Sequence, residues 1–109
     1  MLEKDIENQI KRWLKANKIY HFKVHGSSFM PPGIPDIIAC VKGRFVGIEV
    51  KNKGKLSNQS EQQKIHEKLI KDSGGIFILA DSWQAVEDEL CRNINNFYLS
   101  QTTQNSEKQ

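Results

Sequence analysis

Two carboxylates and one ammonium, those of Asp36, Glu49 and Lys51, lie at the ends of two neighbouring apolar stretches. A pair of carboxylates can hold a divalent cation, and an adjacent ammonium can handle a proton or stabilise negative charge during hydrolysis. This chemistry requires the three side chains to meet on one surface. Their meeting depends on how residues 37–41 and 44–50 are arranged.

Both stretches are rich in β-branched and apolar residues, and only Lys42 and Gly43 separate them, so the segment predicts a β-hairpin. A two-residue turn fixes the register and pairs Asp36 with Glu49, whose Cβ atoms would then lie about 5 Å apart. Because side chains alternate along a strand, Lys51 shares the face of Glu49. The other face of the predicted hairpin is apolar and consists of Ile37, Ala39, Val46, Ile48 and Val50.

Like charges that face each other across a sheet destabilise it, and a cation between them offsets this repulsion. Hard divalent ions such as Mg²⁺ bind carboxylate, carbonyl and water oxygens, so Asp36 and Glu49 are candidate Mg²⁺ ligands. The alternative is that Glu49 and Lys51 form a solvent-facing salt bridge at the edge of a sheet. A Glu-x-Lys in a strand is a weak signal by itself, but Pro35-Asp36 at the paired position and the apolar second face favour a metal site.

The order and spacing of these residues resemble the PD-(D/E)XK motif of restriction-endonuclease-like nucleases, with twelve residues between Pro35-Asp36 and Glu49-Val50-Lys51. The flanking sequence resembles the virus-type VRR-NUC branch, through Gly33-Ile34, Gly47-Ile48 and Gly54-Lys55-Leu56-Ser57. The resemblance covers about residues 2–80. It implies an α/β fold with an αβββαβ core, in which helices flank a mixed central sheet.

The composition predicts a single globular domain with a modest core. The chain has 109 residues, 38% of them hydrophobic and 27% charged, and its net charge of +3 only weakly favours nucleic acid as a partner. It has no membrane-spanning apolar run and no signal-peptide pattern, and Cys40 and Cys91 lack a metal-binding spacing. We therefore expect a cytoplasmic protein (in the host cell if viral), with one domain over residues 1–99 and a disordered polar tail over 100–109.

Apolar residues at helical spacing predict an amphipathic helix over residues 2–16. Glu3 lies within its buried stripe and Glu7 at the edge, and periodicity alone is consistent with ordinary charged residues beside a core helix. The nuclease family commonly has a glutamate here, followed by apolar residues three and seven positions later. Ile6 and Ile10 fit that spacing, so the resemblance selects Glu3 over Glu7. The cations of the far face are expected to be solvated: Lys4, Lys11, Arg12 and Lys15.

A first strand over residues 19–24 and a loop over residues 25–33 precede the predicted hairpin. After the hairpin, the sequence places three lysines within five residues, Lys51, Lys53 and Lys55. Lysines beside a nuclease site can bind backbone phosphates. An ordinary solvated turn is an equally good interpretation of Lys53 and Lys55.

Ser57 or Ser60 can cap the next helix, which is predicted to end near Asp72, before two glycines. Its apolar residues are predicted to face the core: Ile65, Leu69 and Ile70. The family often has Ser-x-x-Gln at the start of this helix, eleven residues before a Gly-Gly pair, which points to Gln63 as the residue that positions Lys51 or a phosphate. Periodicity alone turns Gln62 inward instead.

Residues 76–80 are almost entirely apolar and predict a strand buried on both faces, parallel to the strand of Glu49. Asp81 or Ser82 can cap a further helix that continues through Leu90. A final segment could pack through its apolar residues, Phe97, Tyr98 and Leu99.

The resemblance implies a Mg²⁺-dependent DNA endonuclease in which Mn²⁺ can substitute. Asp36, Glu49 and the carbonyl of Val50 would bind the metal, and water would complete its shell. Lys51 would orient or deprotonate the attacking water or stabilise developing charge, and Glu3 would support the metal shell or a second metal. The implied substrate is branched or structured DNA, such as junctions and flaps, and the implied assembly is a homodimer. The alternatives are a non-catalytic DNA-binding module of the same fold and an interaction protein whose hairpin charges are surface decoration.

Overall fold

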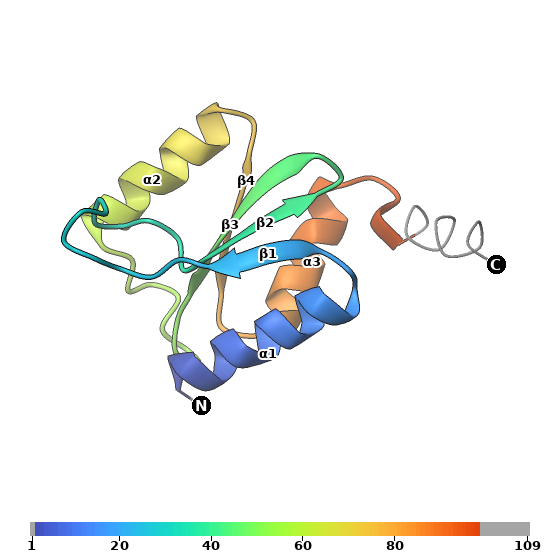
Figure 1. Ribbon diagram of the computed structural model, residues 1–109, viewed down its shortest axis with the longest axis horizontal. Helices are drawn as coiled ribbons and strands as arrows, with labels where there is room; N and C mark the ends of the chain where they lie inside the picture. Colours follow the sequence, from blue (N-terminus) through green and yellow to red (C-terminus); the bar gives the residue numbers. More distant parts are fainter. Residues whose placement is uncertain (1, 99–109) are drawn as a thin grey trace.

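The computed structural model describes residues 2–98, which form three helices and four strands (Figure 1). The predicted order of helix, three-stranded meander, helix, parallel strand and terminal helix is confirmed. In chain order the elements are α1 (Glu3–Ala16), β1 (Tyr20–Lys23), β2 (Ile37–Val41), β3 (Arg44–Val50), α2 (Glu61–Asp72), β4 (Ile76–Ala80) and α3 (Trp83–Asn93). The predicted tail over residues 100–109 and the predicted packing of Leu99 lie outside the described residues.

The four strands form one mixed sheet in the order β1-β2-β3-β4. The first three strands are antiparallel to their neighbours, and β4 is parallel to β3. The hairpin register is the one that a two-residue turn predicts, because Ile37 pairs with Ile48 and Val41 with Arg44. The two turn residues, Lys42 and Gly43, have φ angles of 53° and 79°. Positive φ at both central residues is the geometry of a type I′ turn, whose twist suits a tight hairpin.

The main core lies between the sheet and the two helices α1 and α3, while α2 lies on the opposite side of the sheet (Figure 1). The side chains predicted for the apolar hairpin face are all buried there. The helix α1 contributes Ile6, Ile10 and Leu14, whereas Leu2 is exposed because it precedes the first helical residue. None of the helices within residues 2–98 is long and apolar enough to cross a membrane.

The starts of α2 and α3 are fixed by serine caps. Ser60 Oγ accepts a hydrogen bond from the amide of Gln63, which selects Ser60 over Ser57 as the cap of α2. Ser82 Oγ accepts one from the amide of Ala85 and caps α3. Each cap satisfies an amide that the first helical turn leaves without a partner.

The prediction that Ile65 and Leu69 face the core is wrong, since they are 57% and 56% exposed. The helix α2 contacts the sheet through Ile70, which packs over Gly47 and Gly75. A Cβ atom at Gly75 would lie 2.9 Å from Ile70 Cγ2, and one at Gly47 would lie 3.2 Å from Ile70 Cδ1. The two glycines therefore allow α2 to approach the sheet closely at Ile70, whereas Ile65 and Leu69 stay exposed.

The same face of the sheet exposes further apolar side chains beyond α2. Tyr20, Cys40 and Phe45 are direct cross-strand neighbours, and Phe22 pairs with Ile38 in the next row. Tyr20 is 74% exposed, and Phe22 and Phe45 are about half exposed. We call this region the apolar sheet surface and define it by Tyr20, Phe22, Ile38, Phe45, Ile65 and Leu69.

Candidate active site

Asp36, Glu49 and Lys51 lie where β2 begins and β3 ends, next to the first turn of α2. The amide of Val24 donates to the carbonyl of Asp36 at 2.8 Å, so the pairing of β1 with β2 extends to this residue. The amide of Val50 donates to Asp36 Oδ2 at 2.7 Å. These two hydrogen bonds hold Asp36 against the end of β3, where the register predicts it.

The carboxyl group of Glu49 is buried, with 4% of the residue exposed. This burial, together with the negative charge of Asp36 and a hydrogen bond to it, raises the pKa of Glu49 to about 8. The ammonium of Lys51 lowers this pKa and the charge of Glu3 raises it, both with smaller effect. Glu49 is therefore mostly protonated at pH 7 and can donate its proton to Asp36.

The two oxygens of Glu49 differ in their surroundings. Oε2 accepts a hydrogen bond from Gln63 Nε2 at 2.7 Å. Oε1 is buried and accepts no hydrogen bond from residues 2–98. Once Glu49 loses its proton, this oxygen has no partner unless a cation binds, and an unpaired buried charge is costly.

This donor set fits a hard divalent cation. Two carboxylates share the end of the sheet, and the carbonyl of Val50 lies between Glu49 and Lys51 in the chain. No three His, Cys, Asp or Glu side chains within residues 2–98 form a metal-holding group. A third protein ligand here would therefore be a backbone oxygen, and water would supply the rest, as is usual for Mg²⁺.

Gln63 connects the site to α2. Its Oε1 accepts hydrogen bonds from Lys51 Nζ at 3.0 Å and from the amide of Ser60 at 2.9 Å, while its Nε2 donates to Glu49. The bond to Ser60 is half of a capping box, in which the cap and the third helical residue satisfy each other's amides. Gln63 is thus the glutamine that contacts Lys51 and Glu49, whereas Gln62 is exposed.

Replacing Gln63 with alanine is expected to lower the free energy of unfolding by about 1 kcal/mol, because half of the capping box is removed. The same change at the exposed neighbour Gln62 removes no described hydrogen bond and serves as the matched control. Urea denaturation of both variants measures the difference. Equal stability of the two variants would contradict this role of Gln63.

The two candidate acids of α1 have different surroundings. Glu3 is exposed, and its only described link to the site is its electrostatic effect on Glu49. Glu7 is 9% exposed and its Oε1 accepts a 2.6 Å hydrogen bond from Lys23 Nζ, which in turn lies 4.0 Å from Asp36 Oδ1. Within residues 2–98, neither acid is hydrogen-bonded to Glu49, whose described partners are Gln63 and Asp36.

Lys23, from β1, is a further charged neighbour of the site, next to both Glu7 and Asp36. It is paired with Ile37, so its place next to Asp36 follows from the register of β1, which the sequence alone does not fix. Of the three clustered lysines, Lys51 points into the site, whereas Lys53 and Lys55 are exposed. Asp36 also lines a cavity of about 300 Å³ that it shares with the loop between β1 and β2. The loop residues that line it include Ser27, Met30, Pro31, Pro32, Gly33 and Ile34.

These contacts bring two carboxyl groups, an ammonium and an amide together at one end of the sheet. No family model matches the chain, and no curated protein matches it.

Proposed function

We propose that the protein is a metal-dependent DNA endonuclease that hydrolyses phosphodiester bonds. The proposal rests on the surroundings of Glu49. Its carboxyl group is buried beside that of Asp36, and its Oε1 has no hydrogen-bond partner within residues 2–98 once Glu49 is ionised. Lys51 lies beside it and is held by Gln63. The PD-(D/E)XK and VRR-NUC resemblance of the same residues supports this chemistry, and it supports a restriction-endonuclease-like classification of the mixed α/β fold.

Asp36, Glu49 and the carbonyl of Val50 would hold the metal ion. Bound Mg²⁺ would supply an activated, oriented water and would offset negative charge on the reacting phosphate, and Mn²⁺ suits the same oxygen ligands. The hydrogen bond from Val50 to Asp36 Oδ2 fixes the orientation of that carboxylate.

Lys51 would act directly on the reacting atoms. An ammonium has three N–H donors, and one of them is directed to Gln63 Oε1. The others can donate to a phosphate oxygen or to the attacking water, where they stabilise the charge that develops in the transition state. Gln63 would keep the ammonium in place, and Glu3 would add negative charge near the metal.

The substrate class and assembly follow from the resemblance. We propose branched or structured DNA as substrate, and a homodimer as the active assembly. The apolar sheet surface supports a dimer, because monomeric proteins seldom expose contiguous apolar patches of this kind. Phe45 and Leu69, from β3 and α2, line one cavity of about 290 Å³ within it, which a side chain of a second copy could fill.

Cleavage assays on linear, nicked, flap and four-way DNA test the function, each with Mg²⁺, Mn²⁺ or EDTA. We expect metal-dependent cleavage with preference for the branched substrates. Tight binding without cleavage under all conditions would favour the alternative, a non-catalytic DNA-binding module. Absence of both would leave the hairpin charges as surface decoration and exclude the proposal.

Light scattering at tens of micromolar is expected to give twice the chain mass of 12.5 kDa. Replacing Phe45 and Leu69 with serine should shift the protein to the monomer mass, because these changes remove exposed apolar side chains from the proposed interface. Leu56→Ser is the control, since Leu56 is similarly exposed but lies outside the apolar sheet surface. A wild-type protein of monomer mass would contradict the dimer without affecting the proposed chemistry.

A further inference from the structure

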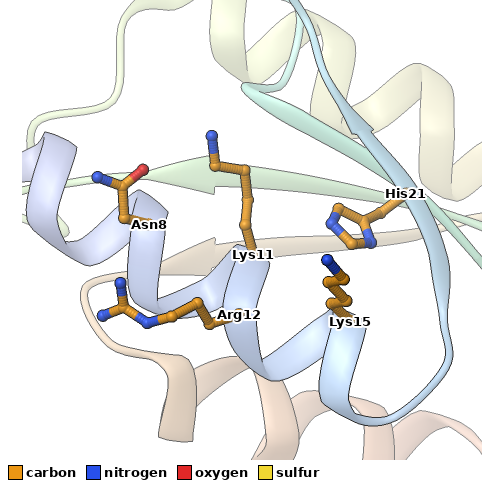
Figure 2. Close-up of a pocket in the computed structure, with 5 residues that line it drawn as sticks. All are labelled: Asn8, Lys11, Arg12, Lys15 and His21. Atoms are coloured by element: carbon orange, nitrogen blue, oxygen red, sulfur yellow. The ribbon is translucent and has the colours of Figure 1, made fainter.

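A groove between α1 and β1 is lined by cationic and polar side chains. It encloses about 240 Å³ and is lined by Asn8, Lys11, Arg12, Lys15 and His21 (Figure 2). Figure 2 shows the ammonium of Lys15 next to the imidazole of His21, with Lys11 on the same side of the helix and Arg12 extending away from them. None of the five lining residues is acidic. We call this region the basic groove.

The groove follows from the periodicities of the two elements that form it. Asn8, Lys11, Arg12 and Lys15 recur at the three- and four-residue spacing that places side chains on one helix face. His21 pairs with Ala39, a buried residue of the main core, so its side chain leaves the sheet on the side that α1 covers. Because β1 is the edge strand, the imidazole stands beside α1 and completes the groove.

The positive charge of the groove is largely uncompensated. Arg12 and Lys15 form no ion pair within residues 2–98. Lys11 lies 3.6 Å from Glu7, but that carboxylate is held more closely by Lys23, at 2.6 Å. The helix α2 shows the contrasting arrangement, in which every lysine is paired with an acid of the same helix: Lys64 with Glu61, Lys68 with Asp72 and Lys71 with Glu67.

The imidazole of His21 adds a further polar group that faces the groove. Its Nδ1 lies 2.9 Å from the carbonyl of Ile19, so the tautomer that satisfies this contact carries its proton on Nδ1. The Nε2 atom then carries the lone pair and accepts hydrogen bonds, so the donors to phosphate are the three cations Lys11, Arg12 and Lys15.

The groove is connected to the candidate active site by a chain of charged contacts. Lys11 contacts Glu7, Glu7 contacts Lys23, and Lys23 contacts Asp36. Along α1, the rise from Glu7 to Lys15 is about 12 Å. One strand of DNA advances about 3.4 Å per nucleotide, so roughly four nucleotides span this distance. A strand that also passes Lys23, which links Glu7 to Asp36, can therefore contact the site and the groove together.

We propose that the basic groove binds backbone phosphates of the DNA strand that leaves the active site. The choice of DNA rests on the proposed function, whereas the affinity for a polyanion rests on the groove itself. An anionic membrane is less favoured, because the lining includes no large apolar side chain that could insert into lipid.

Fluorescence anisotropy with a labelled DNA duplex in EDTA tests the groove without cleavage. The double variant Arg12→Gln/Lys15→Gln removes its two unpaired cations. The control Lys68→Gln/Lys71→Gln removes two ion-paired cations, also three residues apart on a helix, with the same change in net charge. Circular dichroism melts verify that both variants fold.

The groove variant should bind DNA at least about tenfold more weakly near 0.1 M salt, and its salt slope should fall by about 0.9 for each phosphate that the protein no longer neutralises. The control variant should keep the wild-type affinity and slope. Equally weakened binding in both variants, or unchanged binding in the groove variant, would overturn the proposal.

Two further measurements separate the sources of failure. In Mg²⁺, the groove variant should raise KM and keep kcat, since the groove lies outside the reacting atoms. The wild-type protein could fail to cleave DNA while the groove variant still binds DNA more weakly than wild type. That result would refute the proposed nuclease function and support phosphate binding by the basic groove. Vesicles of phosphatidylserine test the membrane alternative. If the wild-type protein binds them, and the groove variant loses this binding but keeps the wild-type DNA affinity, the assignment of the groove to DNA is overturned.

Discussion

Replacing Lys51 with alanine is expected to lower kcat for DNA cleavage by at least about a hundredfold, as is typical when a group that stabilises transition-state charge is removed. Asp36→Asn and Glu49→Gln should each cause a reduction of the same order, because each removes a negatively charged metal ligand. The three effects should combine far less than multiplicatively, since the groups act on one transition state. Single-turnover kinetics with saturating DNA and Mg²⁺ measure them.

Matched controls exist for each change. Lys53→Ala removes an exposed lysine two residues away and should alter KM but not kcat. Asp72→Asn removes an exposed carboxylate whose described partner is Lys68, and should leave both parameters unchanged. Full activity in EDTA, or an active Lys51→Ala protein, would refute the proposed chemistry.

The second large effect concerns stability in the absence of metal. Burial and the neighbouring Asp36 raise the pKa of Glu49 to about 8, from an ordinary value of 4.5. The folded protein therefore keeps this proton over a pH range in which the unfolded chain releases it. Stability from this group is complete below pH 4.5 and is lost as the pH rises towards 8.

Glu49→Gln is expected to abolish this pH dependence, because glutamine resembles the protonated acid at every pH. Relative to this variant, the wild-type protein should lose on the order of 3 kcal/mol of unfolding free energy between pH 5 and pH 8 in EDTA. Urea denaturation at several pH values measures the difference. Glu61→Gln is the control, since this acid is exposed on α2. Parallel pH profiles for wild type and Glu49→Gln would show that the carboxyl group is not perturbed.

The hairpin was the most predictable part of the chain. Its strands, turn and register depend on neighbouring residues, and the close approach of Asp36 to Glu49 follows from counting across the turn. The bounds of β4 were predictable for a similar reason, because Gly74-Gly75 precede its apolar run and Asp81 follows it.

Other features depended on contacts between distant elements. Periodicity identifies Ile65 and Leu69 as an apolar helix face, but it does not show whether anything covers that face. The partner of Glu7 is Lys23, from a strand whose register the sequence leaves open. Lys4, Arg12 and Lys15 of α1 are exposed, as predicted, but nothing in the helix itself indicates that His21 stands beside Lys15.

The double role of Gln63 has a consequence for cooperativity. Its side chain completes the cap of α2 and accepts the hydrogen bond from Lys51, so fraying of the first turn of α2 also displaces the acceptor that holds Lys51. Ordering of this turn and assembly of the site are thus thermodynamically linked, and a ligand that engages the site slows local opening of the helix. Amide hydrogen exchange in the first turn of α2 would report site occupancy even where no DNA is cut.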